Sequence, residues 1–315
     1  MSAGIRPSAG PGRDAGPGIA APHGPGAAML PGGRLHLSWG PIDLVIGAEG
    51  PGREAALGVA RAAFGPVLPR LMEEIDALRS PAGPPLHGPV ARRMRAACLP
   101  HEGFVTPMAA VAGAVADHVL AAMLGAAPGL RRAWVNDGGD VAVHLAPGEA
   151  MTMALCDDPR LGTVPGRLRL DRPCGVATSG WRGRSHSLGI ADAATVLART
   201  AAEADVAATL IANAVDLPGH PAVSRRPARA LSPDSDLGDR PATVAVGRLS
   251  PREADRALAA GLARAERMRA AGLIEGAVLL LACRAVWTEG FGDPAAGAAR
   301  DGPGAGHRRI PGAVA

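Results

Sequence analysis

The hydrophobic residues of this chain change their spacing along its length, and each spacing predicts a different kind of element. Residues 35–48, LHLSWGPIDLVIGA, alternate apolar and polar side chains on both sides of Gly40-Pro41, which predicts two short strands joined by a turn. A helical period starts at Arg53, and beyond a Gly-Pro break apolar residues recur three or four positions apart over residues 68–78. A further helix is predicted over residues 90–98.

The middle of the chain combines a helix of small residues with a series of short strands. The segment TPMAAVAGAVADHVLAAML, residues 106–124, predicts a helix with Thr106 as its N-cap and Pro107 in the first helical position. Residues 132–145, RAWVNDGGDVAVHL, predict two strands joined by a polar, glycine-rich turn. Further strands are predicted over residues 151–156, 167–170, 175–178 and 193–198.

Two capping boxes mark the starts of helices in the last third of the chain. Thr200 with Glu203 predicts the start of one helix, and Ser250 with Glu253 predicts the start of another, which closes at Gly272. Between these helices lies a proline-rich connector that contains the acidic segment SPDSDLGDRP. It is followed by a predicted strand, ATVAVG.

The segment LIEGAVLLLACRAV, residues 273–286, predicts a final buried strand. Strands and helices occur in clusters along the chain and do not alternate strictly. This arrangement favours an α+β fold with antiparallel sheets over a doubly wound α/β fold.

Composition limits the ordered part of the chain to its centre. The 315 residues include 43 Gly and 30 Pro, and residues 1–33 contain nine of the former and six of the latter without apolar periodicity. We interpret residues 1–33 as a disordered leader, residues 34–290 as a single domain and residues 291–315 as a disordered tail.

The charge, the cysteines and the hydropathy exclude several classes of function. A net charge of +4 and a pI near 9.4 are compatible with nucleic-acid binding, but the basic residues are scattered and aromatic platforms are scarce. The four cysteines form no CxxC pair, which argues against a zinc site and a disulfide framework. No signal peptide and no apolar run of about 18 residues is evident, so we expect a soluble, cytoplasmic protein.

Asp205 and Thr209 are the first candidate for chemistry, because they lie one helical turn apart in the apolar segment EADVAATLIANAV. A carboxylate and a hydroxyl on the same face of a buried helix supply two oxygen ligands to a hard cation such as Mg²⁺. The alternative is a structural role, in which the threonine bonds to its own backbone and the aspartate interacts favourably with the helix dipole.

The second candidate is the turn VNDGGDVAV, with Asn136, Gly138, Gly139 and Asp140. Two glycines let the backbone approach a ligand, and the flanking polar side chains can bind its edge. The alternative is an ordinary hairpin turn. The segment is not a dinucleotide-binding fingerprint, because a strand follows it and not a helix.

The third candidate is the segment VATSGWRGRSHSLG, residues 176–189. It places hydroxyls, guanidinium groups and an imidazole between two apolar runs, where polar groups need partners. Hydroxyls, backbone amides and arginines are typical of phosphate sites. The residues in question are Thr178, Ser179, Gly180, Arg182, Arg184 and His186. The alternative is a polar surface loop, and a serine hydrolase is disfavoured because no GxSxG motif is present.

The three candidates occur in an order that resembles the ApbE-like superfamily. The segments that carry the likeness are TPMAAVAGAVADHVL, VNDGGDVAVHL, GVATSG, SHSLGIADA and EADVAATLIANAV. They are most similar to an uncharacterised branch of that superfamily, and the likeness covers residues 35–290. The resemblance implies a T-fold of two related halves, each built of strands and a helix, and by analogy a homo-oligomer.

Characterised ApbE relatives are magnesium-dependent FAD:protein FMN transferases, which move FMN onto a threonine of a target protein. The resemblance therefore implies that Asp205 and Thr209 bind Mg²⁺, and that the glycine turn with the TSG segment lies beside FAD or a related nucleotide. It also assigns His186 to the position of a histidine in the relatives' HiiDP segment, where it would position the acceptor. Arg182 or Arg184 would stabilise the charge of the diphosphate.

Two departures from the transferase pattern lead to a second hypothesis. The transferases have Lys-Gly where this chain has Ala112-Gly113, and they have HiiDP where this chain has His186-Ser187-Leu188-Gly189. The first hypothesis is thus an enzyme that transfers a phosphoryl-linked group with Mg²⁺. The second is a non-catalytic ligand-binding module in flavin or sulfur metabolism.

Overall fold

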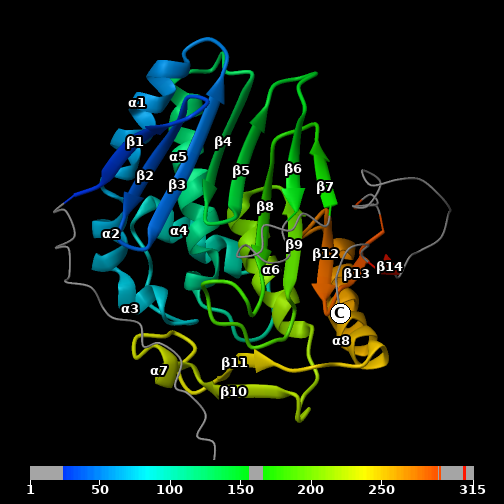
Figure 1. The fold of residues 1–315 in the computed structure, drawn as a ribbon. Helices are drawn as coiled ribbons and strands as arrows, with labels where there is room; N and C mark the ends of the chain where they lie inside the picture. Colours follow the sequence, from blue (N-terminus) through cyan, green and yellow to red (C-terminus); the bar gives the residue numbers. More distant parts are fainter. Residues whose placement is uncertain (1–23, 156–165, 290, 292–307, 310–315) are drawn as a thin grey trace, which may run out of the picture.

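An antiparallel sheet of ten strands forms the frame of the molecule (Figure 1). The computed structural model describes residues 24–155, 166–289, 291 and 308–309. In spatial order the strands are β1 (Gly26–Leu30), β2 (Arg34–Trp39), β3 (Ile42–Glu49), β4 (Arg132–Asp137), β5 (Asp140–Leu145), β8 (Cys174–Ser179), β9 (Ala193–Ala198), β12 (Gly276–Leu281), β13 (Arg284–Trp287) and β14 (Arg308–Arg309). Every neighbouring pair is antiparallel.

The described helices mostly cover one face of this sheet (Figure 1). They are α1 (Arg53–Phe64), α2 (Val67–Glu73), α3 (Ile75–Leu78), α4 (Pro89–Cys98), the 3₁₀ turn η1 (Pro107–Ala110), α5 (Val111–Ala126), α6 (Ala201–Ala214), α7 (Ala228–Leu231) and α8 (Pro251–Ala270). The expected α+β fold with antiparallel sheets and packed helices is confirmed.

Strand alternation explains why the helices pack where they do. Leu35 and Leu37 of β2 and Leu44 and Ile46 of β3 point to the helical side and are fully buried there. The buried residues of the central helices α5 and α6 are mostly Ala, Val and Leu, which pack between the sheet and the other helices. The main core therefore lies between the sheet and the helices.

A second, smaller core lies on the opposite face of the sheet. There β6 (Met151–Leu155) and β7 (Gly166–Leu170) form a separate two-stranded ribbon in front of the main sheet (Figure 1). Leu155, Leu168 and Leu170 of the ribbon pack with outward-facing residues of β5, β8 and β12. The central strands are thus buried on both faces, as their continuous apolar runs require.

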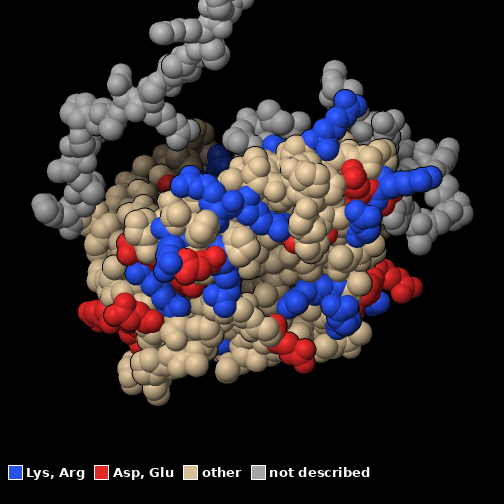
Figure 2. Space-filling model, turned by 90° about the horizontal axis from the view of Figure 1, so that it is seen from below, with Lys and Arg blue, Asp and Glu red and all other residues tan. Residues whose placement is uncertain are grey.

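An excursion between α6 and α8 lies below the ends of the central strands (Figure 1). It contains α7 and a ribbon of β10 (Val223–Pro227) and β11 (Pro241–Val246). The hydroxyl of Thr106, which is 1% exposed, donates to Asp236 of this excursion, and the guanidinium of Arg240 lies 3.2 Å from the centroid of the Phe104 ring. On this lower face arginines gather in several groups with acidic side chains among them, so the basic pI does not produce one continuous patch (Figure 2).

Four sequence predictions need correction. The expected leader ends earlier than residue 33, because Gly26–Leu30 forms β1. The expected tail contains β14. Residues 1–23, 292–307 and 310–315 lie outside the described residues. Residues 273–286 form two strands, since Ala282 and Cys283 adopt positive φ angles of 48° and 60° and make a tight turn. Thr106 occupies the N-cap position as expected, but its side chain accepts no N–H of the helix, and its hydroxyl donates to Asp236.

Taken together, η1 and α5 (Pro107–Ala126) form the one described helical segment that is long and apolar enough to cross a membrane, with a mean hydropathy of 1.6. Length and composition alone do not separate such a helix from the core helix of a soluble protein. Here its buried residues belong to the main core, where they lie among residues of α1, α6 and the sheet. Its apolar character is therefore explained by its central position in this fold.

Candidate functional site

The main candidate site lies where the β4–β5 hairpin and the end of β8 meet α6. Asp137 follows Ala133 and Val135 in the alternation of β4, so its side chain points to the helical face of the sheet. Asp140 shares that face with Ala142 of β5. Because α6 packs on β8 next to β5, the acidic side chains of the hairpin and Asp205 of α6 come into the same region.

Asp205 is half-buried and receives hydrogen bonds from a second helix. Its Oδ2 atom accepts the N–H of Gly113 at 3.0 Å, and the N–H of Ala112 also donates to the carboxylate. Burial raises the pKa of Asp205 well above its usual range, and the charges of Asp140 and Asp137 raise it further. The amide donors act in the opposite direction without reversing the shift.

Asp137 and Asp140 have raised pKa values for the same main reason. Burial raises the pKa of Asp137, which is 4% exposed, to about 7, although the N–H of Asp43 and the charge of Arg184 oppose the shift. Burial also raises the pKa of Asp140 to about 7, against a hydrogen bond from the N–H of Thr178. Three carboxyl groups with one nearby arginine thus form a region that favours protons or a cation.

Positions 138 and 139 of the hairpin need glycine for structural reasons. Gly138 and Gly139 adopt φ angles of 64° and 117°, which suit glycine, and the N–H of Gly139 donates to Oδ1 of Asn136 at 2.8 Å. A Cβ atom on Gly138 would lie 2.0 Å from a guanidinium nitrogen of Arg184. The turn therefore lets Arg184 lie directly over the hairpin, beside the carboxyl groups of Asp137 and Asp140.

Thr178 and Ser179 are neighbours at the end of β8, but their side chains lie on opposite faces of the sheet. The hydroxyl of Thr178 is bonded to that of Thr195 at 2.8 Å, on the opposite face of the sheet from Asp205, while its backbone N–H binds Asp140. Ser179 lies on the helical face by strand alternation. Gly180 is required by chain packing, since a Cβ there would lie 2.4 Å from the carbonyl oxygen of Asp192.

The loop after β8 is organised by Asp192. Its Oδ1 atom accepts hydrogen bonds from Nε1 of Trp181 at 3.1 Å and from Nε of Arg182 at 2.7 Å, and its Oδ2 atom accepts the N–H of Ala282. The guanidinium of Arg182 also lies 4.7 Å from the centroid of the Trp181 ring. Arg182 is thus engaged inside the protein, whereas Arg184 is exposed above the hairpin.

His186 is half-buried in the same loop. The next residue, Ser187, donates its hydroxyl to Oδ1 of Asn213 at 3.2 Å, and the N–H of Leu188 donates to the same oxygen at 2.8 Å. These bonds tie the loop to the last turn of α6. They hold His186 at the end of the helix whose first turns carry Asp205.

Thr209 is half-buried on α6, one turn beyond Asp205, as the sequence predicts. Within the described residues no group of three or more His, Cys, Asp or Glu side chains is arranged to hold a metal ion. A cation at this site would therefore have to combine the Asp205 carboxylate with the Thr209 hydroxyl, backbone oxygens and water. Such mixed oxygen sets are typical of Mg²⁺.

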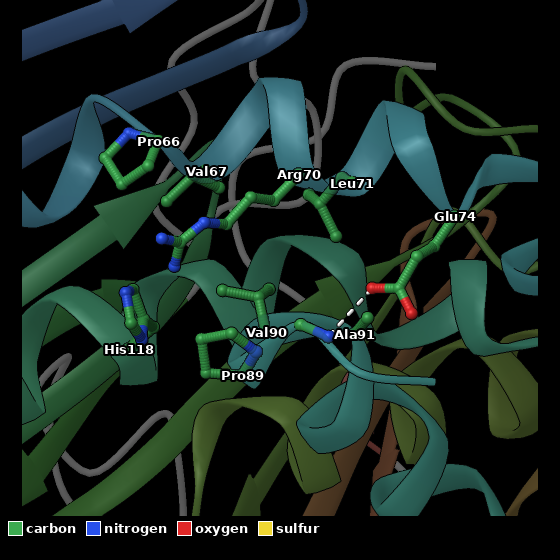
Figure 3. Close-up of a pocket in the computed structure, with 10 residues that line it drawn as sticks. Pro66, Val67, Arg70, Leu71, Glu74, Pro89, Val90, Ala91 and His118 are labelled. Carbon is green, nitrogen blue, oxygen red and sulfur yellow. Dashed lines mark hydrogen bonds between the residues drawn. The ribbon is translucent and has the colours of Figure 1, made fainter. Parts of the chain in front are cut away.

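A groove elsewhere on the surface does not contain any of these residues. It lies between α2 and α4, where Arg70 extends towards His118 of α5 and Glu74 accepts the N–H of Gly88 at 2.9 Å (Figure 3). Burial lowers the pKa of His118, and the charges of Arg93 and Arg70 lower it further. The groove is shallow and its walls are mainly apolar side chains of α2 and α4.

Comparison with known proteins places the chain in a family. Residues 27–293, which include all of the candidate site, match the sequence profile of a family described as "AbpE bacteria". The chain belongs to this ApbE-like family. Curated relatives of this ApbE-like chain are uncharacterised UPF0280 proteins, so the branch expected from the sequence is confirmed as well.

The relatives match only part of their length. The UPF0280 protein of Archaeoglobus fulgidus is 37% identical over 118 residues, 35% of this chain and 45% of the relative. The UPF0280 protein of Methanothrix thermoacetophila is 39% identical over 140 residues, which are 40% of this chain and 52% of the relative. The UPF0280 protein of Methanopyrus kandleri is 40% identical over 110 residues, which are 35% of this chain and 43% of the relative. The chain thus spans about half the length of the curated relatives it matches.

Two solved structures are also similar. An ApbE protein from Thermotoga maritima shares 20% identity over 52% of this chain and 63% of its own, with a TM-score of 0.32. The flavinyl transferase ApbE from Pseudomonas stutzeri, in its apo form, shares 14% identity over 84% of this chain and 94% of its own, with a TM-score of 0.42. At these values no residue of the ApbE-like chain is assigned a role from either structure.

Proposed function

We propose that this ApbE-like protein binds a divalent cation, Mg²⁺, at Asp205 and Thr209 and a flavin nucleotide such as FAD beside it. The observation that carries the proposal is that Asp205 of α6 lies beside Asp140 and Asp137 on the helical side of the sheet, where burial raises the pKa of all three carboxyl groups and the charges of Asp140 and Asp137 raise that of Asp205 further. Buried carboxyl groups are stabilised by a proton or by a cation. A cation would therefore replace protons there at neutral pH.

The donor set fits a hard cation. Asp205 and Thr209 provide a carboxylate and a hydroxyl on one face of α6, and oxygen donors with retained water suit Mg²⁺. The N–H of Gly113 binds Oδ2 of Asp205 and the N–H of Ala112 also donates to this carboxylate, so both fix its position. When bound, the cation would neutralise the negative charge of a diphosphate.

The nucleotide would lie between the hairpin and the end of β8. The Asn136 side chain and the backbone of Gly138 and Gly139 offer a polar edge without side-chain bulk, and Ser179 lies on the same face as Asp137 and Asp140. Arg184 lies over the hairpin, where its guanidinium could pair with phosphate oxygens, and Arg182, paired with Asp192, would support the loop that carries Arg184.

The reaction that fits these groups is transfer of FMN from FAD to a hydroxyl of a target protein. A P–O bond of the diphosphate would break, AMP would leave with the bridging oxygen, and the acceptor oxygen would form the new P–O bond. Arg184 would stabilise the charge that develops on the phosphoryl oxygens. His186 would orient the acceptor hydroxyl and take up its proton.

A binding module without transfer chemistry is the second candidate. Ala112 stands where the transferases have a lysine, and its side chain offers no cation to a phosphate. The segment His186-Ser187-Leu188-Gly189 lacks the Asp-Pro of the relatives, and the N–H of Leu188 ties it to Asn213. In this version the site would bind the nucleotide and deliver it to a partner.

Incubation of the purified full-length protein with FAD, Mg²⁺ and a threonine-containing acceptor peptide tests both candidates. We expect release of AMP that requires Mg²⁺ and falls by at least about 100-fold in Asp205→Asn, because a cation ligand has been replaced. Glu203→Gln is the matched control. It removes a carboxylate from the same helix, but one that is paired at the surface with Arg199.

The outcomes separate the two candidates. FAD binding without AMP release, measured by quenching of flavin fluorescence, would support the binding module. Equal AMP release by the wild type and Asp205→Asn would contradict the proposed cation site. Absence of both binding and release would contradict the proposed nucleotide site.

A further inference from the structure

The two central helices approach each other unusually closely at their first turns. A Cβ atom on Gly113 of α5 would lie 2.2 Å from the carbonyl oxygen of Ala201 of α6, so this contact exists only with glycine. On the other side of α6, a Cβ on Gly175 of β8 would lie 2.0 Å from the carbonyl carbon of Thr200. The first turn of α6 is therefore held between α5 and the sheet.

Each of these helices places one carboxylate on the first turn of the other. Asp117 of α5 accepts the N–H of Ala201 at 3.1 Å through Oδ1 and the N–H of Ala202 at 3.0 Å through Oδ2. Asp205 of α6 accepts the N–H of Gly113 at 3.0 Å. These N–H groups lie in the first turns of helices, where no partner exists within the helix.

The N–H donor and the carboxylate acceptor have the same sequence spacing in α5 and in α6. Gly113 donates and Asp117 accepts on α5, and Ala201 donates and Asp205 accepts on α6, so in both helices the donor and the acceptor are four residues apart. The segments GAVAD and AAEAD align without a gap. Carrying the alignment on, Ala121 of α5 corresponds to Thr209 of α6, so only α6 has the hydroxyl.

We infer that Asp117 is a positioning residue, which fixes α6 against α5 and thereby sets where Asp205 lies relative to the acidic hairpin. Its two oxygens bind two successive N–H groups, so they restrain both the sliding and the rotation of α6. Asp117 itself lies near the charges of Arg93 and Glu203, away from the hairpin. It acts through the backbone of α6 and does not touch the proposed ligand.

Asp117→Asn tests this inference with a minimal change of shape. The asparagine keeps one oxygen and replaces the other by an NH₂ group, which cannot accept an N–H, so one of the two bonds to α6 is lost. We expect hydrogen exchange to accelerate at Ala201 and Ala202, and also at Gly113, whose N–H is bonded to Asp205 and not to Asp117. Glu203→Gln again serves as the control that loses a carboxylate from the same region.

The exchange at Gly113 decides between positioning and simple capping. If only Ala201 and Ala202 exchange faster in Asp117→Asn, the residue merely caps α6 and the inference is overturned. If Gly113 also exchanges faster while the protein remains folded by circular dichroism, the inference is supported. This measurement needs no cation, so its result stands whatever the outcome for the proposed function.

A second measurement rests on the proposed function. With Mn²⁺ as the probe, titrated into the full-length protein and followed by electron paramagnetic resonance, we expect Asp117→Asn to bind the ion about 10- to 100-fold more weakly, as is usual for residues that orient a metal ligand. When Asp117→Asn is combined with Asp205→Asn, we expect no further loss of Mn²⁺ affinity beyond that of Asp205→Asn alone. An unchanged affinity in Asp117→Asn, with normal binding by the wild type, would overturn the inference. Failure of the wild type to bind Mn²⁺ would contradict the cation site alone.

Discussion

At the scale of single residues, the most unusual feature is the burial of Asp137 on the face of β4 that otherwise carries apolar side chains. Ala133 and Val135 occupy the same face of β4 and are completely buried. Asp137 has few compensating partners: the N–H of Asp43 at 3.4 Å, and the charge of Arg184. A carboxylate in such surroundings costs folding free energy whenever it is ionised.

Asp137→Asn should therefore stabilise the protein at high pH. The folded-state pKa, about 7, lies above the value of an unfolded carboxyl, ~3.9, so the unfolded chain loses this proton first and the wild type loses stability as pH rises from ~4 to ~7. Asparagine keeps the oxygen that accepts the Asp43 N–H. We expect a gain of roughly 4 kcal/mol at pH 8 and little change at pH 4, measured by urea denaturation with EDTA. An equal change at both pH values would contradict this account.

At the scale of elements, the contact between α5 and α6 depends on one glycine. Gly113 lies in the first turns of α5, and its hydrogen atoms face the backbone of Ala201. Glycine in a helix normally lowers stability by about 1 kcal/mol relative to alanine. This position retains it because a side chain would separate the two helices and the carboxylates that join them.

Gly113→Ala should destabilise the protein, and Gly58→Ala should do the opposite. Gly58 lies in the exposed middle of α1, and a Cβ there would meet no atom within 4 Å, so we expect a gain of about 0.5–1 kcal/mol. At Gly113 we expect a loss of about 2–3 kcal/mol or more, because the backbone of Ala201 cannot move aside cheaply. Thermal and urea denaturation of both variants provide the test. A similar change in the free energy of unfolding for the two variants would show that α5 and α6 separate easily.

At the scale of the whole molecule, the excursion between α6 and α8 is fastened to the rest of the protein by a few polar contacts. Asp236 accepts the hydroxyl of buried Thr106, Arg240 stacks on Phe104, and the N–H of Thr243 donates to the carbonyl of Ser187 at 2.8 Å. These contacts hold the excursion below the ends of the strands that carry the candidate site (Figure 1). The acidic segment SPDSDLGDRP thus serves a structural purpose.

Asp236→Ala should loosen this excursion without disturbing the central helices. The substitution leaves the Thr106 hydroxyl buried without its acceptor, which costs about 1–3 kcal/mol. We expect faster hydrogen exchange across residues 228–247 and unchanged exchange in α5 and α6. Asp234→Ala is the matched control, since Asp234 is exposed and its nearest cation, Arg79, is 3.9 Å away. Equal effects of the two variants would show that the Thr106 contact does not fasten the excursion.

Patterns among neighbouring residues predict several features of the fold correctly. The hairpin within residues 35–48, the α6 helix with Thr200 at its start and the complete capping box of Ser250 with Glu253 follow from patterns over a few positions. The shared face of Asp205 and Thr209 follows from the helical period in the same way. Local geometry is set by local sterics and hydrogen bonding, so one sequence suffices to predict it.

Which of these elements meet depends on contacts between residues that are far apart in the chain. The bond between Asp117 and Ala201 joins residues 84 positions apart, and that between Asp205 and Gly113 joins residues 92 positions apart. Strand alternation then turned Thr178 away from Asp205 and brought Asp137 towards it, a difference of one position in each strand. Such contacts arise from the packing of two helices on a sheet, and no spacing along the chain encodes them.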